Sequence, residues 1–295
     1  MSTNEERRAQ AKRKLDEQVA QRAEAARKQR QILMIAGAVV AVLLVAGVVF
    51  VVLRGDGDSG SVSASSTSET TDAADSSEAS PGEPGQLPKF TASPTLGANC
   101  QYPKSARPAS KPVEPPRSGK VPTEPAEVSV SMMTDQGPIG LMLNNAQSPC
   151  TVNSFISLGA KDFFAGTQCH RLTTSPMLSV LQCGDPAGDG TGGPGYQFAN
   201  EYPTDQYAPN DPAAGQPVTY PRGTLAMANA GPGTNGSQFF LVYRDSMLPP
   251  QYTVFGRIQD DGLATLDKIA AGGVQGGGTD GPPVTTVTVK SVRAD

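Results

Sequence analysis

The chain has 295 residues, a formal net charge of −4 and an aromatic content of 5%, with no Trp. This charge provides no basic surface for DNA or RNA, so the composition excludes an ordinary nucleic-acid-binding protein. With one His and no C-x-x-C pair among four cysteines, the chain also lacks the ligands of a typical zinc site, and we expect no metal and no cofactor.

An uninterrupted apolar run extends from Ile32 to Leu53. At 1.5 Å per residue, one helix of this length crosses a bilayer core of about 30 Å. A cleaved signal peptide is the alternative, but its apolar region is shorter and a small-residue cleavage site follows it. The run therefore predicts a transmembrane anchor over 32–53.

Residues 1–31 contain many helix formers and basic residues, including Arg27, Lys28 and Arg30 just before the apolar run. Because segments rich in Lys and Arg stay in the cytoplasm, we expect 1–31 to form a cytoplasmic, charged helical tail. The sequence thus predicts a single-pass cell-membrane protein whose part after Arg54 is extracytoplasmic.

The next two segments differ from a globular domain in composition. Residues 54–98 are rich in Ser, Asp and Pro with few apolar residues, which predicts a disordered linker. Residues 99–125 are Pro-rich and should be stiffer. A ligand for an SH3-like module is one interpretation of them. The other is a stalk docked to the folded domain, which Cys100 favours.

The foldable part is 126–295. Alternating apolar residues over 126–134 and 138–144, separated by Asp135-Gln136-Gly137, predict a β-hairpin. Ser148 is expected to cap a short helix from Pro149 to about Leu158. A second helix is expected over Leu263–Ala271, closed by two glycines.

Six further runs have the apolar character of strands: Cys169–Leu172, Val180–Cys183, Gly223–Ala228, Gln238–Tyr243, Tyr252–Ile258 and Val284–Val292. Many closely spaced strands and only two helices predict a mainly β fold, a closed antiparallel barrel with helices at its ends. All four cysteines fall on the predicted outer side, where an even number of thiols indicates disulfides. Three pairings of the four are possible.

The sequence contains no obvious nucleophile and base. His170 lies in a strand pattern, so we interpret it as structural. The glycines of GDGTGGPG match a dinucleotide loop, but no helix follows them. There remains a group of residues without an assigned role: Arg171, Gln182, Asn229, Gln238 and Phe240.

Residues Met227–Phe240, MANAGPGTNGSQFF, resemble the signature of the cyclophilin family of peptidyl-prolyl cis-trans isomerases. CHRL from Cys169, QCGD from Gln182, the GDGTGG loop and TVFGRI from Thr253 are similar to further family segments in the same order. The resemblance extends over about 126–292, and with the apolar run it is to a membrane-anchored bacterial, actinobacterial-like form.

The resemblance implies an eight-stranded antiparallel closed barrel capped by two helices. It also implies an enzyme that accelerates rotation about X-Pro bonds in exported or cell-envelope proteins, with Pro-containing polypeptides as partners. Arg171 is the implied catalytic residue. The implied substrate-binding residues are Val180, Gln182, Gly190, Ala228, Asn229, Gln238, Phe240, Leu248 and Tyr252. The alternative is a non-catalytic adaptor or chaperone that binds Pro-containing peptides in the same groove.

Several positions depart from the family pattern. Ser179-Val180 stands where common members have Phe-Met, and the connection from Arg171 to Gln182 is longer, so the proline pocket loses an aromatic wall. Met247 stands where cyclosporin-sensitive members carry Trp, which implies weak cyclosporin binding. By the same resemblance, Cys169 and Cys183 lie on adjacent strands and can pair. Cys150 can then hold Cys100 of the stalk.

Overall fold

The structure is a computed structural model that describes residues 85–295. The predicted cytoplasmic tail (1–31), the membrane anchor (32–53) and the greater part of the linker lie outside the described residues. Within residues 85–295, no helix combines the length and the apolar character needed to cross a membrane.

A long antiparallel hairpin opens the domain, as the alternating pattern predicted. Strand β1 (Glu127–Thr134) pairs with β2 (Pro138–Asn144), and Met132 lies opposite Ile139. Both side chains are fully buried, because alternate residues of a strand point to the same face. The hairpin therefore presents one apolar side to the core.

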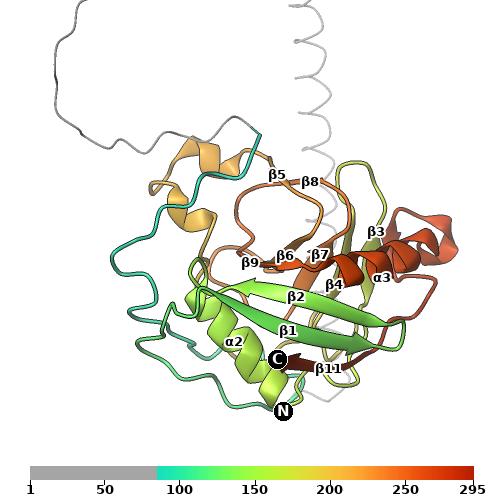
Figure 1. Cartoon of the computed structure of the whole chain (residues 1–295), viewed down its shortest axis with the longest axis horizontal. Coiled ribbons are helices and arrows are strands. Elements are labelled where there is room, and N and C mark those ends of the chain that lie inside the picture. The colour runs from blue at the N-terminus through green and yellow to red at the C-terminus, as the bar shows by residue number, and fades with distance from the viewer. Residues whose placement is uncertain (1–84) are drawn as a thin grey trace, which may run out of the picture. The chain divides into compact units, whose positions relative to one another are not determined.

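In residues 85–295, nine strands form one antiparallel sheet in the order β10-β3-β4-β7-β6-β9-β2-β1-β11 (Figure 1). The remaining seven strands are β3 (Arg171–Thr173), β4 (Val180–Cys183), β6 (Thr224–Met227), β7 (Phe239–Val242), β9 (Val254–Ile258), β10 (Asp280–Gly281) and β11 (Val289–Ala294). A separate two-stranded sheet joins β5 (Val218–Tyr220) to β8 (Ser246–Leu248).

The prediction of an eight-stranded closed barrel was wrong in this respect: the sheet curls into a half-barrel. Its edge strand β10 has two residues, and Pro282 and Pro283 follow it. Because proline has no N–H to donate, the strand cannot continue into a ladder. Residues 166–169, before β3, reach residues 287–289 at the start of β11 through three backbone hydrogen bonds and an isolated bridge between Gln168 and Thr288.

Two α-helices cover the sheet, as predicted for this part of the chain. Helix α2 (Pro149–Ala160) packs against β11 and β2, and α3 (Asp260–Ala271) packs against β2 (Figure 1). Gly262 lets α3 approach closely, since a Cβ there would lie 2.8 Å from Ile258 Cγ2. Three short 3₁₀ helices complete the described part: η1 (Thr204–Gln206), η2 (Pro212–Gly215) and η3 (Gln275–Gly277).

Ser148 occupies the N-cap position of α2, but its side chain does not cap the helix. Its hydroxyl donates to the carbonyl of Val254 over 2.8 Å. The first helical N–H groups donate instead to Glu201, from Cys150 N over 2.9 Å and from Thr151 N over 2.8 Å. A carboxylate from a distant loop therefore performs the role predicted for Ser148.

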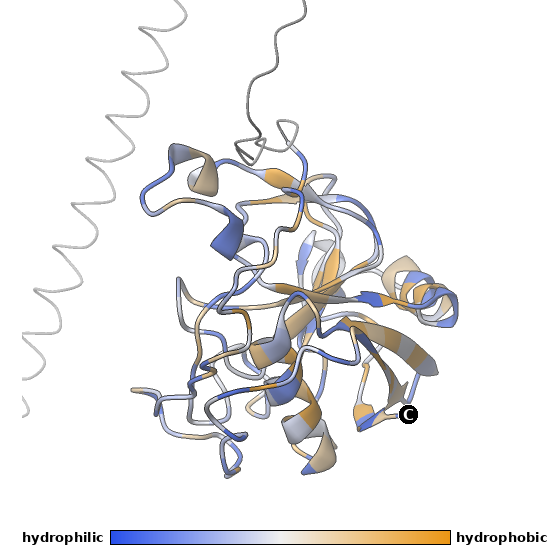
Figure 2. Cartoon of the chain, turned by 60° about the vertical axis from the view of Figure 1, so that its left-hand side comes forward, coloured by the Kyte–Doolittle hydropathy of each residue, from blue (hydrophilic) through white to orange (hydrophobic). Residues whose placement is uncertain are grey.

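Phe155 of α2 lies at the centre of the main core. Its ring centroid lies 5.2 Å from that of Phe164, 5.3 Å from that of Phe239 and 5.1 Å from that of Phe255. Figure 2 shows hydrophobic residues along the helices and strands, with hydrophilic residues in several connecting loops. The aromatic cluster fixes α2 against strands β7 and β9.

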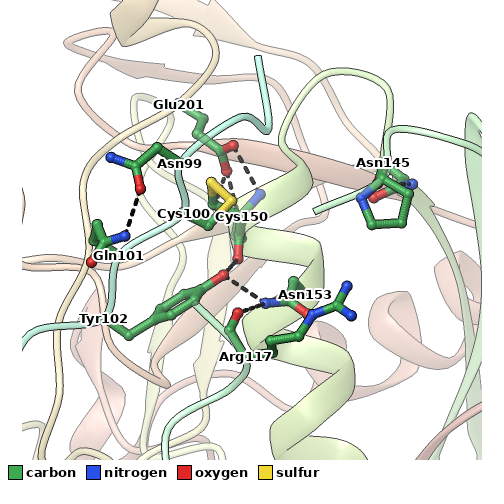
Figure 3. Close-up of a disulfide and its surroundings, with 11 residues drawn as sticks. Asn99, Cys100, Gln101, Tyr102, Arg117, Asn145, Cys150, Asn153 and Glu201 are labelled. Carbon is green, nitrogen blue, oxygen red and sulfur yellow. Dashed lines mark hydrogen bonds between the residues drawn. A yellow bond between two sulfur atoms is a disulfide. The ribbon is translucent and has the colours of Figure 1, made fainter. Parts of the chain in front are cut away.

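The segment before β1, teal in Figure 1, runs around the outside of the domain. The range predicted as a linker, 54–98, overlaps the described residues, and there Leu87 and Phe90 pack against an apolar cluster of the domain. Cys100 is bonded to Cys150 at the start of α2 (Figure 3), and Cys169 is bonded to Cys183. The stalk is thus attached to the domain covalently and by packing.

Candidate functional site

Strand register places three of the predicted site residues in one row. Arg171 on β3 lies opposite Gln182 on β4, and Gln182 lies opposite Phe240 on β7. Directly opposite residues of antiparallel strands project from the same face of the sheet. The three side chains therefore share one surface, although they are far apart in sequence.

The polar side chains in this row are linked by hydrogen bonds. Arg171 Nη1 donates to Gln182 Oε1 over 3.2 Å, and Gln182 Nε2 donates to Gln238 Oε1 over 2.9 Å. Gln238 Nε2 in turn donates to the carbonyls of Gly190 and Gly192, over 3.0 Å and 2.9 Å. The chain of bonds orients the guanidinium relative to the glycine loop.

Asp280 holds the other side of Arg171, which the sequence analysis did not anticipate. Arg171 Nε donates to Asp280 Oδ1 and Nη2 donates to Oδ2, each over 2.7 Å. The ion pair raises the pKa of Arg171 and lowers the pKa of Asp280 from their usual values. The side chain of Arg171 is 37% exposed, so it is fixed on both sides and still accessible.

An apolar cluster adjoins the row. Phe240 lies at its centre, with the ring of Tyr252 edge-on at 5.8 Å and that of Tyr220 at 6.4 Å between centroids. Val180, Leu248 and Ala228 belong to the same cluster. The structure therefore brings together the residues that the resemblance implied for a proline pocket.

Ala228 and Asn229 follow the end of β6 and line a cavity together with Gln182 and Gln238. The amide of Asn229 is used to hold its own loop, since Nδ2 donates to Gln251 O over 2.9 Å and Oδ1 accepts from Gly231 N over 3.1 Å. Within residues 85–295, the backbone N–H and C=O of Asn229 form no hydrogen bond. They are thus available to an extended peptide.

A cavity of about 430 Å³ lies next to the row, lined by Gln182, Gln238 and Asn229 among others. Its other wall comes from residues 105–108 of the stalk. Asp280 and this wall are the two site features that sequence reasoning missed. Asp280 lies on a strand of two residues within a Gly- and Pro-rich sequence, which is too short to show a strand period, and the stalk lies outside the resemblance, so neither had a local signal.

His170 lies beside the site without joining its hydrogen-bond chain. Both ring nitrogens are buried and have no partner within the described residues. Burial lowers the pKa of His170, so the ring is neutral near pH 7. The geometry agrees with a structural role rather than with a base.

The arrangement can bind an extended peptide, hold an apolar ring and direct a permanently charged donor at the bond between them. Across residues 85–295 no group of three or more His, Cys, Asp or Glu side chains is placed to hold a metal ion. Rotation about a peptide bond breaks no bond, and its barrier of about 18–20 kcal/mol comes from delocalisation of the nitrogen lone pair. A fixed donor at that nitrogen lowers the barrier. The fold and the groove are those of a peptide-bond isomerase.

Comparison with known proteins identifies the family. The sequence model described as cyclophilin type peptidyl-prolyl cis-trans isomerase/CLD matches residues 129–294. A probable peptidyl-prolyl cis-trans isomerase B of Mycobacterium leprae is 67% identical over 100% of both chains. A protein of the same description from Mycobacterium tuberculosis is 74% identical over 71% of this chain and 68% of its own. The chain belongs to the cyclophilin-type peptidyl-prolyl cis-trans isomerases and is an enzyme of that class.

A solved structure is also similar, that of a cyclophilin type peptidyl-prolyl cis-trans isomerase from Cryptosporidium parvum. It is 28% identical, with a TM-score of 0.46, and the alignment covers 57% of this chain and 98% of that chain.

Proposed function

We propose that this isomerase acts through Arg171 on Pro-containing segments of exported or cell-envelope proteins, from a membrane anchor and on the outer side of the membrane. The observation that carries the catalytic part is the position of Arg171, held by Asp280 and Gln182 at the edge of the apolar cluster around Phe240. A proline ring in that cluster places its nitrogen beside the guanidinium.

The role of each predicted residue follows from this pose. Phe240, Val180 and Leu248 receive the proline ring. Gln182 and the backbone of Asn229 hold the flanking peptide. Arg171 donates to the prolyl nitrogen, which localises its lone pair and weakens the partial double bond. A ten-thousandfold acceleration requires about 5.4 kcal/mol, which a few oriented hydrogen bonds can supply.

The catalytic part is tested with the full chain and an Ala-Pro peptide, by following cis-to-trans conversion. We expect Arg171→Ala to lower kcat/KM by about a hundredfold or more, and Arg171→Lys to restore little, because Lys cannot form the two-pronged contact with Asp280. Arg257→Ala is the matched control, since Arg257 forms an exposed ion pair with Glu127 over 3.2 Å. An Arg171→Ala enzyme as active as the control would refute the role of Arg171.

Two observations support the extracytoplasmic location. The apolar run from Ile32 to Leu53 is preceded by basic residues, and all four cysteines of the chain form disulfides, which persist in oxidising compartments. Protease added to intact cells without their wall should degrade residues 85–295 and spare an epitope at the N-terminus. Protection of the C-terminal part, or free thiols in protein isolated with a thiol-blocking reagent, would contradict the location.

A further inference from the structure

Residues 103–110 include the part of the stalk that lines the cavity, 105–108, and we call them the strap. Gln197 N donates to Pro103 O over 3.0 Å, Ser105 N donates to Gly195 O over 2.9 Å, and Ser110 N donates to Gly193 O over 3.0 Å. Between the bonds of Ser105 and Ser110, residues 105–108 line the cavity. It therefore forms a wall and not a loose tail.

Two glycines lie in close contact with the strap. A Cβ at Gly195 would lie 2.9 Å from Ala109 Cβ, and a Cβ at Gly192 would lie 2.7 Å from Ser110 Oγ as well as 2.0 Å from Asp185 Oδ1 of its own loop. Gly195 also has a φ of 82°, a conformation that favours glycine. The glycine loop and the strap thus fit each other closely at two points.

The strap is held at both ends. Before it, the Cys100–Cys150 disulfide ties the chain to α2, and the hydroxyl of Tyr102 donates to Cys150 O over 2.7 Å (Figure 3). After it, Lys111 Nζ donates to the carbonyls of Asp162, Phe163 and Ala165 over 2.7, 2.9 and 3.2 Å. A segment that is fixed at both ends keeps its side chains in a constant position beside the groove.

The strap supplies the charge of the cavity. In the described part of the chain, Arg107 is the one charged residue among those that line it, and its side chain forms no ion pair. Two acids of the adjoining loop lie behind this lining and are held by backbone N–H groups. Asp185 accepts from the Gly190 N–H over 2.6 Å, and Asp189 accepts from the Thr191 N–H over 2.9 Å. Among the described residues that line the cavity, Arg107 is therefore the charged side chain that an entering group meets.

We propose that the strap completes the substrate groove and that Arg107 makes it selective for peptides with an acidic side chain near the X-Pro bond. The cavity shares Gln182 and Gln238 with the row that leads to Arg171, and Ala228 with the apolar cluster around Phe240. A peptide whose proline ring occupies that cluster thus places a neighbouring side chain in the cavity. The inference rests on the proposed groove, and it adds a specificity that the catalytic residues do not provide.

The test measures kcat/KM of the full chain on Ala-Pro peptides that carry Glu, Ala or Lys at each of the two positions on either side of the pair. At one of these positions we expect Glu to exceed Lys by about three- to tenfold, since the contrast combines attraction with repulsion at a partly exposed site. The preference should shrink at high salt, because ions screen exposed charges.

Three variants distinguish the outcomes. Arg107→Ala should bring the Glu-to-Lys ratio close to one, and Arg107→Glu should reverse the ratio. Lys104→Ala is the matched control, because Lys104 lies on the strap, bridges to Tyr196 through its backbone and does not line the cavity. It should retain the preference.

An unaltered ratio in Arg107→Glu, or no preference in the unmodified chain at any position, would overturn the proposal. After either result, turnover of the Ala peptide would still support the proposed groove. A chain that does not turn over the Ala peptide would instead count against the proposed catalytic site, so the two failures are distinguishable.

Discussion

Asp280 lies opposite Thr173 in the pairing of β10 with β3, and its carboxylate reaches the guanidinium of Arg171, two residues away on β3, through two parallel hydrogen bonds of 2.7 Å. Two-pronged contacts of this kind fix the plane of the guanidinium as well as its position. Asp280 does not line the cavity, so in the proposed mechanism it acts on a substrate through Arg171.

We expect Asp280→Asn to lower kcat/KM about fivefold, because the amide retains one acceptor and loses the charge and the second contact. Asp280→Glu should recover part of the loss. The hydrogen bonds from Arg171 lower the pKa of Asp280. The ion pair is therefore fully formed at any pH above the usual pKa of an Asp side chain, and it is lost as the pH falls through the lowered pKa. Peptide assays from neutral to acidic pH check both points. Full activity in Asp280→Asn would show that Gln182 alone orients Arg171.

Local patterns were sufficient for the longest elements of the fold. The hairpin β1–β2, strand β4 and the start of α2 at Pro149 lie where periodicity and proline placed them. The expected strand over Val284–Val292 was misplaced, since β11 runs from Val289 to Ala294. The short strands β5, β8 and β10 were missed, because two or three residues are too few to establish a period.

The residues of the candidate site likewise differ in whether a local sequence pattern marks them. Arg171, Gln182 and Phe240 could be predicted as site residues because the motifs around them are local in sequence, and the structure places them in one row. Asp280 reaches Arg171 only through the β10–β3 pairing, and Glu201 reaches α2 only through folding of the chain. No local sequence motif surrounds either of these residues, so the sequence does not indicate that they are partners of Arg171 and α2.

Glu201 is a buried carboxyl with three donors: Cys150 N, Thr151 N and Thr151 Oγ1, the last over 2.6 Å. We expect Glu201→Gln to lower the free energy of unfolding by about 2–4 kcal/mol, because an amide places its own N–H groups against these donors. Urea unfolding measures the loss. Glu114→Gln, an exposed position in the stalk, is the control and should be close to neutral.

The same carboxyl makes stability depend on pH. Burial raises the pKa of Glu201 from 4.5 to about 7, although the donors from Thr151 and Cys150 oppose the rise. Between these values the folded chain keeps a proton that the unfolded chain has released, so stability should fall as the pH rises from about 4.5 to about 7. Unfolding midpoints across this range, compared with those of Glu201→Gln, isolate the contribution. A rise of stability over this window that vanishes in the variant would contradict the raised pKa.

The two disulfides should contribute differently. Cys100–Cys150 closes a loop with a sequence separation of 50, and Cys169–Cys183 one of 14. In the chain-entropy description the longer loop stabilises the fold by about 4 kcal/mol and the shorter by about 3 kcal/mol. A Cys100→Ser/Cys150→Ser double variant should also loosen the strap and weaken the Glu-to-Lys preference. The Cys169→Ser/Cys183→Ser pair is the control, and equal loss of preference in both would contradict the strap as the cause.

Met247 leads to a prediction for cyclosporin. It lies on β8, where its thioether sulfur accepts from the Thr219 hydroxyl over 3.2 Å. A thioether offers neither the flat face nor the N–H of an indole, so we expect a dissociation constant weaker than micromolar. Met247→Trp should tighten binding at least tenfold in a calorimetric titration. Submicromolar binding by the unmodified chain would show that this position does not control affinity.

The bond between Cys100 and Cys150 also determines where a mechanical load enters the domain. Once Leu87 and Phe90 are pulled from their apolar cluster, tension on the chain ahead of Cys100 passes through the two sulfur atoms into the first turn of α2, whose Phe155 lies at the centre of the aromatic core. Residues 101–149 lie inside the covalent loop and carry none of that tension. The strap and the hairpin β1–β2 would keep their shape while the chain ahead of Cys100 is pulled.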